Sequence, residues 1–334
     1  MGSQRHATVA GLGSVLPERV VPNAWFESLV DTSDEWIQER TGIKERRFAV
    51  DGQATSDLAT EASRRALDIA GIAPEQLDLL VCATLTPDTP IPSTAVWIQR
   101  KLAISAPSFD VNAACAGFSY ALSTGTAFIE SGQAETVLIV GAEILSRVMD
   151  FRDRTTCILF GDGAGAVVLR RSEDPGVLGS VLGADGRAAE VLFIPAGGSV
   201  SPPSHGTVDA RDHSIRMPNG REVFKRAVVE MAAACRQLLE KSGHTPDEVH
   251  LLIPHQANAR IMIAVADRLG IGPDRAVIDV ETVGNTSAAS IPIALDRAWR
   301  AGRVGEGDLV LLTSFGAGLA WGANLLRWTG PAAP

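Results

Sequence analysis

The sequence repeats one pattern: Ala73-Pro-Glu-Gln-Leu-Asp-Leu-Leu-Val81 resembles Thr245-Pro-Asp-Glu-Val-His-Leu-Leu-Ile253, about half the chain further on. Each copy follows a run with apolar residues at helical spacing, and a glycine, Gly71 or Gly243, ends that run. Each copy closes on a short apolar stretch, which predicts a buried strand. The chain therefore contains the same helix, turn and strand twice.

Two further pairs of segments occur in the same order in the two halves. Val137–Val140 matches Val310–Thr313, and Phe160–Arg171 resembles Phe315–Arg327. Fewer residues separate the two members of this last pair than separate the members of the other pairs. The first half therefore has extra residues before Phe160, which we place in an insertion around residues 144–159. Loops frequently carry function, and we expect the same of this insertion.

The shared order of these pairs indicates an internal duplication, with a period too long for a solenoid. Helices alternate with short apolar strands in both halves, which predicts an α/β protein with largely buried sheets. We expect two halves, residues 1–172 and 173–334. If their sheets share central helices, the halves form a five-layered α-β-α-β-α stack.

The composition is that of a globular protein, with 46% hydrophobic and 21% charged residues among 334. Because 39 Asp and Glu outnumber 30 Lys and Arg, the net charge of −9 disfavours nucleic acid or an anionic membrane as partner. No signal peptide or run of about 18 apolar residues is present. The cysteines form no C-x-x-C pair and no zinc spacing, and we therefore predict a cytoplasmic protein without a metal site. They are Cys82, Cys115, Cys157 and Cys235.

Cys115 lies at a predicted strand-to-helix turn in Phe109-Asp-Val-Asn-Ala-Ala-Cys-Ala-Gly-Phe-Ser-Tyr-Ala-Leu122. The macrodipole and free N–H groups of a helix N-terminus stabilise a thiolate, so this position predicts a lowered thiol pKa. Alanine and glycine neighbours leave room for a substrate. A small buried hydrophobic residue is the alternative interpretation of Cys115, and it is the preferred one for the other cysteines.

His255 and Asn285 are candidate partners for a nucleophilic cysteine. His255 follows the predicted strand Leu251–Pro254, and strand ends are where chemistry gathers in α/β folds. Asn285 opens a later helix, where an N-cap is the alternative interpretation. Because Asn285 is approximately the repeat counterpart of Cys115, we expect pseudo-twofold symmetry to bring the two together.

At these three positions the sequence resembles the β-ketoacyl-ACP synthase III family of thiolase-fold condensing enzymes, in which ACP is acyl carrier protein. The resemblance covers nearly the whole chain and implies the thiolase fold, in agreement with the internal duplication. The matching segments are Thr32–Ile37, Arg40–Ile43, Ala113–Phe118, Phe160–Gly165, His255–Asn258, Gly284–Ser287 and Phe315–Gly322.

The resemblance implies a reaction in two steps. Acyl-CoA acylates Cys115, and a decarboxylative Claisen condensation with malonyl-ACP then gives 3-oxoacyl-ACP, which initiates fatty acid biosynthesis. The backbone N–H groups of Cys115 and Ala317 form the oxyanion hole, whereas His255 and Asn285 hold the enolate oxygen. The family requires no metal or redox cofactor and forms a homodimer, so acyl-CoA and malonyl-ACP are the expected partners.

The resemblance also implies binding residues. For CoA, Trp36 and Arg154 sandwich the adenine, and Thr32, Gly220 and Asn258 line the pantetheine channel. The alternative interpretation of Trp36 is a core residue of an amphipathic helix.

Acyl and carrier contacts are implied in the same way. Phe160 packs against the acyl pocket, whose floor comes from the partner subunit at the position of Ile91. An isoleucine there leaves room for a longer or branched primer. Lys225, Arg260 and Arg268 resemble the patch that docks the acidic carrier, although ordinary solvated helix faces look similar.

Other functions stay open. A priming synthase or acyltransferase of polyketide or secondary metabolism uses the same triad with a different acceptor. Plant-type polyketide synthases share the triad but are longer and differ at the final glycine motif. Papain-like peptidases also have catalytic Cys, His and Asn residues in this order along the chain, yet they usually carry secretion signals and lack the repeat. In a non-catalytic binding module, Cys115 would be inert to acyl-CoA.

Overall fold

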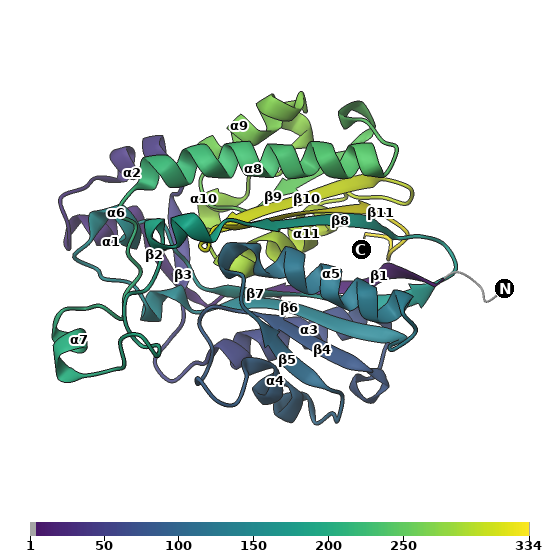
Figure 1. The fold of residues 1–334 in the computed structure, drawn as a ribbon, viewed down its shortest axis with the longest axis horizontal. Helices are drawn as coiled ribbons and strands as arrows, with labels where there is room; N and C mark the ends of the chain where they lie inside the picture. The colour runs from purple at the N-terminus through teal and green to yellow at the C-terminus, as the bar shows by residue number, and fades with distance from the viewer. Residues whose placement is uncertain (1–4, 334) are drawn as a thin grey trace.

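The computed structural model describes residues 5–333 and contains two large β-sheets with the same strand order, besides a small sheet of two strands (Figure 1). The first sheet runs β1 (His6–Val15), β7 (Gly163–Ser172), β6 (Thr136–Glu143), β4 (Leu79–Ala83) and β5 (Ser108–Val111). The second runs β8 (Val177–Ala184), β11 (Ala320–Arg327), β10 (Leu309–Gly316) and β9 (Leu251–Pro254). A parallel bridge from Leu252 to Ala276 stands where β4 pairs with β5. This shared order confirms the duplication.

Helices separate and cover the sheets in the predicted five-layered α-β-α-β-α stack (Figure 1). The central layer consists of α5 (Gly117–Glu130) and α11 (Ser290–Arg300), each of which packs on strands of both sheets. The outer layers are α3 (Thr55–Ala70) and α4 (Thr94–Leu102) on the first sheet, and α8 (Gly220–Lys241) and α9 (Ala259–Leu269) on the second. The outer helices α3 and α8 come from equivalent places in the two halves.

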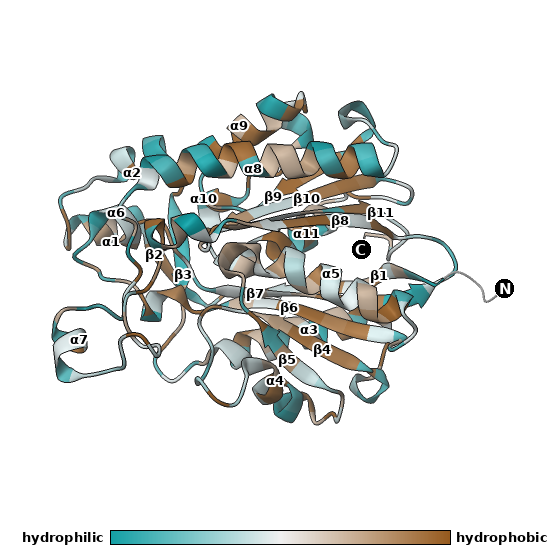
Figure 2. Cartoon of the chain, viewed as in Figure 1, coloured by the Kyte–Doolittle hydropathy of each residue, from teal (hydrophilic) through white to brown (hydrophobic). Residues whose placement is uncertain are grey.

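Both faces of the inner strands are buried, which explains their uninterrupted apolar sequence. In β6, Val137 and Ile139 join the cluster around the central helices, whereas Leu138 and Val140 join the cluster beneath α3 and α4. Figure 2 shows these strands as strongly hydrophobic, with hydrophilic residues on the outer helix α8. Within residues 5–333, we find no helix that combines the length and the apolar character needed to cross a membrane.

The remaining elements lie mostly at one end of the stack, on the left in Figure 1. They are β2 (Arg19–Pro22), α1 (Asn23–Glu27), α2 (Asp34–Thr41), β3 (Glu45–Phe48), α6 (Arg154–Cys157), α7 (His205–Asp209) and α10 (Val280–Val283). Short 3-10 turns link the elements: η1 (Pro74–Gln76), η2 (Ala114–Ala116), η3 (Leu145–Arg147), η4 (Gly186–Val191), η5 (Pro246–Glu248), η6 (Pro273–Arg275) and η7 (Ser287–Ala289). The inserted segment 144–159 therefore contains η3 and α6. The division into residues 1–172 and 173–334 stays a prediction.

Candidate active site

Cys115 lies in the tight turn η2 between β5 and α5. The turn begins at Ala114 with a left-handed φ of 46°, and the Ala114 N–H donates to Asn112 Oδ1 at 3.2 Å. Gly316 at the end of β10 comes so close that a Cβ there would lie 2.6 Å from the Cys115 nitrogen. Glycine is therefore needed at 316, and strands of both sheets hold the turn that carries Cys115.

Burial dominates the electrostatics of Cys115, which is 7% exposed. Desolvation raises the pKa of its thiol to about 12, although the Ser287 hydroxyl and the Cys115 backbone N–H favour the thiolate. The lowered thiol pKa expected from the sequence is therefore wrong for the free protein, because loss of solvent outweighs the helix N-terminus. Cys115 is a neutral thiol near pH 7, so its deprotonation has to accompany the attack on substrate.

His255 stands directly after β9, and its backbone N–H donates to Thr313 O of β10 at 2.7 Å. The side chain is 3% exposed, and desolvation lowers its pKa to about 3. The imidazole is thus neutral near pH 7. Its Nδ1 lies 2.6 Å from Ser290 Oγ at the start of α11, which leaves Nε2 for a substrate.

Asn285 lies just before η7, which leads into α11. Its backbone exchanges two hydrogen bonds with the end of the insertion: the Asn285 N–H donates to Leu159 O, and the Gly161 N–H donates to Asn285 O, both at 2.9 Å. Asn285 Oδ1 accepts from the Ser287 N–H at 2.9 Å. Because its oxygen is occupied in this way, the side-chain NH2 group is the part of Asn285 that is left to donate to a substrate.

The turns η2 and η7 are copies of each other. Each begins with a left-handed residue, at φ 46° and 49°, and in each an asparagine Oδ1 accepts from the N–H of that residue. When the two turns are aligned on these left-handed residues, Asn285 corresponds to Asn112, and Ala288 corresponds to Cys115. The approximate pairing of Asn285 with Cys115 that the sequence suggested is therefore wrong in register, although both residues do reach the same cavity.

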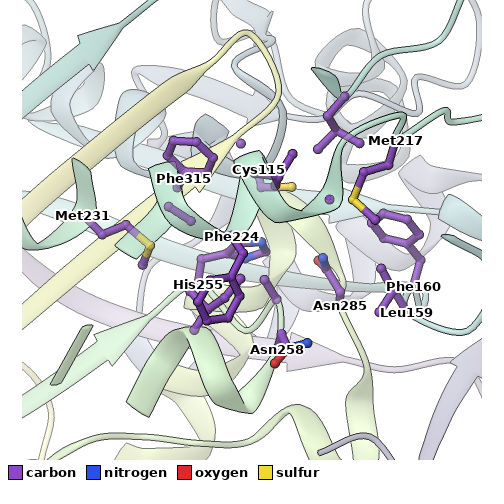
Figure 3. A pocket seen from close by; sticks show the side chains of 17 residues that line it. Cys115, Leu159, Phe160, Met217, Phe224, Met231, His255, Asn258, Asn285 and Phe315 are labelled. Carbon is purple, nitrogen blue, oxygen red and sulfur yellow. The ribbon is translucent and has the colours of Figure 1, made fainter. Parts of the chain in front are cut away.

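Cys115, His255 and Asn285 line one cavity of about 130 Å3 (Figure 3). Its other walls are largely apolar and include Leu159, Met217, Phe224, Met231 and Phe315. A second cavity of about 230 Å3 shares Cys115, Phe160 and Leu192 with the first. It is lined by Leu85, Leu145, Leu192, Phe193, Ile194 and Ile215, and by Ala317 and Asn112. The thiol thus borders both a chamber with hydrogen-bond donors and an apolar chamber.

Two of the residues predicted to bind CoA, Gly220 and Asn258, line the first cavity. Asn258 also caps α9, since its Oδ1 accepts from the Arg260 N–H, and its Nδ2 donates to Arg40 O, both at 2.9 Å. Thr32 lines neither cavity, and its hydroxyl is buried without a hydrogen-bond partner. Two of the three residues predicted to line the pantetheine channel therefore lie at the cavity, and their role in binding stays a prediction.

Trp36 and Arg154 stack directly on each other, with the guanidinium carbon 4.9 Å from the ring centroid. An adenine between them needs roughly 7 Å, twice the usual contact distance of stacked carbon atoms. Arg154 is also 3.7 Å from Asp31 Oδ2. The side chains are adjacent, as an adenine clamp requires, but Arg154 has to swing away before a base can enter.

Of the two residues predicted for the acyl pocket, Phe160 is 5% exposed and borders both cavities. Ile91 is 87% exposed and lines neither cavity. A role for Ile91 in the pocket therefore requires a second copy of the chain and stays a prediction.

The predicted carrier patch, Lys225, Arg260 and Arg268, is exposed on α8 and α9. The Arg260 guanidinium carbon lies 5.9 Å from the ring centroid of Phe224, a residue of the first cavity. Arg260 thus connects the patch to the cavity that holds the triad, whereas Arg268 lies in the last turn of α9, where its carbonyl oxygen accepts from Arg236. Next to Lys225, Arg226 differs in that it pairs with Asp185 and Glu230.

Sequence reasoning missed three polar residues around the triad: Glu143, Ser287 and Ser290. Glu143 is fully buried and accepts hydrogen bonds from Thr84, Leu85 and Thr86. Desolvation raises its pKa to about 7, although these donors favour the carboxylate. Its signal in the sequence is a charged residue that closes an otherwise apolar strand. Among residues 5–333, no three His, Cys, Asp or Glu side chains are grouped so as to hold a metal ion.

Comparisons with known proteins agree on one family. The family model described as 3-oxoacyl-(acyl-carrier-protein) synthase III matches residues 109–186, and that of its C-terminal part matches residues 239–328. The β-ketoacyl-(acyl-carrier-protein) synthase III of Caldanaerobacter subterraneus is 51% identical over 97% of this chain and 98% of its own. Its counterpart from Xylella fastidiosa is 49% identical over 98% of this chain and 100% of its own.

Solved structures give the same result. The crystal structure of 3-oxoacyl-(acyl-carrier-protein) synthase III from Aquifex aeolicus is similar with a TM-score of 0.89 and 48% identity, covering 96% of this chain and 100% of that one. A priming β-ketosynthase of a polyketide biosynthetic pathway has a TM-score of 0.91 at 37% identity, covering 100% of this chain and 99% of that one. On these grounds the chain belongs to the 3-oxoacyl-(acyl-carrier-protein) synthase III family.

Proposed function

We propose that the chain catalyses the two-step condensation of a β-ketoacyl-ACP synthase III. In the first step, the Cys115 sulfur loses its proton and attacks the thioester carbonyl of acyl-CoA, and CoA leaves as its thiol with a proton. In the second, malonyl-ACP loses carbon dioxide, and the resulting enolate carbon attacks the acyl-Cys115 carbonyl. The C–S bond to Cys115 breaks, 3-oxoacyl-ACP leaves, and the thiol recovers a proton.

The convergence of Cys115, His255 and Asn285 on one cavity is the observation that carries this proposal. The backbone N–H groups of Cys115 and Ala317 stabilise the oxyanion of the first step, because both residues border the apolar cavity that takes the acyl chain. His255 Nε2 and the Asn285 NH2 group stabilise the enolate of the second step. No cofactor takes part in either step.

The partners in this proposal are acyl-CoA and malonyl-ACP. Trp36 and Arg154 hold the adenine once their direct stacking has opened, and Gly220, Asn258 and Thr32 guide the pantetheine. The exposed Lys225, Arg260 and Arg268 receive the acidic carrier. A cytoplasmic homodimer, in which Ile91 reaches the acyl cavity of the partner, completes the proposal.

A priming synthase of polyketide biosynthesis is the second candidate, favoured by the full-length similarity to a priming β-ketosynthase at a TM-score of 0.91. The identity of 37% to that protein is lower than the 51% to the relative from Caldanaerobacter subterraneus. This difference favours the first candidate. The two candidates differ in primer and acceptor rather than in the chemistry at Cys115.

Intact-mass spectrometry after incubation with a panel of acyl-CoA esters tests the proposal. We expect an acyl adduct that is absent in Cys115→Ala and that is discharged by malonyl-ACP to give 3-oxoacyl-ACP. An adduct that persists with malonyl-ACP but moves to another acceptor would favour an acyltransferase. A chain that forms no adduct with any ester would contradict both candidates.

A further inference from the structure

Ser290 is a fully buried polar residue at the start of α11 that lines neither cavity. Its Oγ lies 2.6 Å from Nδ1 of His255 and accepts from the backbone N–H of Gln256 at 3.4 Å. No other hydrogen bond of this hydroxyl occurs within residues 5–333. Ser290 thus touches the ring of His255 on the nitrogen that does not face a substrate.

The donors and acceptors around this hydroxyl determine where its proton points. A serine hydroxyl has one proton to donate and two lone pairs to accept with. The Gln256 N–H fills one lone pair, and Nδ1 is the neighbour that can accept the proton. A buried, neutral imidazole carries one N–H, so an Nδ1 that accepts from Ser290 leaves the proton of the ring on Nε2.

Gln256 is itself held firmly, which keeps its backbone N–H aimed at Ser290. Its Nε2 donates to Pro254 O at 2.7 Å and to Val277 O at 3.1 Å, and its Oε1 accepts from the Asp279 N–H at 2.6 Å. Every polar atom of this side chain is therefore engaged. The arrangement around Ser290 is fixed from both sides before any substrate binds.

We propose that Ser290 is a positioning residue that holds His255 in the Nε2–H tautomer, so that His255 donates a hydrogen bond to the substrate. The role of that donor rests on the proposed condensation. In this tautomer Nε2 has no lone pair in the ring plane with which to take the proton of Cys115. His255 therefore serves the decarboxylation and not the activation of the thiol.

A comparable arrangement at Asn285 supports the inference, because there too a neighbouring group occupies the acceptor atom of the side chain. There a backbone N–H, that of Ser287, occupies the side-chain oxygen and leaves the NH2 group for the substrate. At His255 the Ser290 hydroxyl occupies Nδ1 and leaves the Nε2–H group. Both side chains are thus committed as donors by a neighbour from the start of α11 or from the turn η7 that leads into it.

Nuclear magnetic resonance of the full chain labelled with 15N-histidine tests the tautomer directly, without substrate. We expect the ring of His255, assigned by comparison with His255→Gln, to show a protonated Nε2 and an unprotonated Nδ1 near pH 7.5. Ser290→Ala is expected to lose this single pattern, and Ser290→Thr is expected to keep it. A protonated Nδ1 in the unsubstituted protein would overturn the proposal whatever the variants do.

Kinetics then separate a positioning role from a merely structural one. We expect Ser290→Ala to slow decarboxylation of malonyl-ACP by about 10-fold to 100-fold, below the cost of losing a whole donor, while acylation of Cys115 changes less than about 3-fold. Ser290→Thr restores most of the decarboxylation rate. Ser63→Ala is the control, because it also removes a buried helical hydroxyl, one that donates to Ala59 O in α3.

Equal losses of acylation and decarboxylation in Ser290→Ala, or no more loss than in Ser63→Ala, would overturn the positioning role. Failure of the proposed function is distinguishable from this result. A chain that forms no acyl adduct contradicts the function, yet the tautomer of His255 can still be read from the spectrum.

Discussion

Cys115, His255 and Glu143 have lost nearly all contact with solvent, and each is pushed toward its neutral form. A thiol with a pKa of about 12 beside an imidazole with a pKa of about 3 does not form an ion pair readily. The resting site is thus uncharged at these two residues, and charge develops only during reaction.

Replacement of His255 by alanine is expected to separate the two steps. His255→Ala should lower the rate of malonyl-ACP decarboxylation by about 10²–10³, the cost of one lost donor, while Cys115 is still acylated within about 10-fold of the normal rate. Carbon dioxide release and intact mass measure the two steps. His250→Ala, at an exposed histidine, is the control, and equal losses in both steps would contradict the separation.

Glu143 makes stability depend on pH with a definite sign. Its pKa rises from 4.5 to about 7 on folding, because burial disfavours the carboxylate. Between these values the folded state binds more protons than the unfolded state, so the free energy of unfolding falls as pH rises. In Glu143→Gln this fall is absent, and we expect the stability of the variant relative to the unsubstituted protein to rise by up to about 3 kcal/mol across the window. Urea unfolding at several pH values measures it; a difference independent of pH would contradict it.

Single positions left Cys115 and Asn285 open to structural interpretations, and the order of several motifs along the chain was needed to predict both of them and His255; all three line one cavity. The direction of the Cys115 pKa shift was wrong, because a sequence displays the helix N-terminus but not the loss of solvent. Glu143 and Ser290 escaped notice since their partners, Thr86 and His255, are distant in sequence. Contacts between such residues become visible only when the fold brings the segments together.

At the scale of elements, α8 and α9 carry the exposed cations Lys225, Arg260 and Arg268, and Arg260 lies over Phe224 of the cavity of the triad. An acidic protein with a net charge of −9 repels an acidic carrier over long distances, and we therefore propose that local cations provide the docking site. Arg226 cannot contribute equally, because Asp185 and Glu230 already neutralise it. Within residues 5–333, Arg226 thus has carboxylate partners that are not found for Lys225, Arg260 or Arg268, a difference that the sequence pattern alone did not reveal.

The variant Lys225→Glu/Arg260→Glu/Arg268→Glu tests this surface. We expect the KM for malonyl-ACP to rise by about 10-fold or more, because like charges across an interface are repulsive, while acylation by acyl-CoA changes less than about 2-fold. Lys241→Glu, an exposed lysine at the other end of α8, is the matched control. An unchanged KM, or a KM that rises equally in the control, would show that the carrier docks elsewhere.

The element order was predictable because glycines mark the ends of the helices before both copies of the repeat. Gly71 and Gly243 do adopt left-handed φ values of 63° and 70° at those ends. The register of the turns before α5 and α11 was not predictable from the motifs. It depends on a backbone conformation that Ala114 and Ser287 share, and neither residue type signals a left-handed φ.

At the scale of the whole molecule, the first sheet ends at β5, whose outer edge has no partner strand within the described residues. Open edges attract a further strand, and Ile91 exposes 87% of its surface. We therefore expect sedimentation to give a dimer, twice the 35.2 kDa of one chain. A monomer at micromolar concentration would contradict this expectation.

Primer selection tests the same assembly through its chemistry. With isoleucine at position 91, we expect comparable rates of acylation by acetyl-CoA and by medium or branched acyl-CoA esters. In Ile91→Trp, the larger side chain should fill the partner's cavity and favour the short primer by about 10-fold or more. Strict preference for acetyl-CoA in the unsubstituted protein, or an unchanged primer preference in Ile91→Trp, would show that Ile91 does not line the acyl pocket.

Ala288 occupies the place in the second half that Cys115 occupies in the first. A Cβ added at Gly117 would lie 3.4 Å from the Ala288 side chain, and one added at Gly141 would lie 2.3 Å from its carbonyl oxygen. The position equivalent to the nucleophile has thus become a packing contact that supports the nucleophile. The duplicated architecture therefore offers one nucleophile of this kind per chain, and we expect titration with acyl-CoA to saturate at a single acyl group per chain.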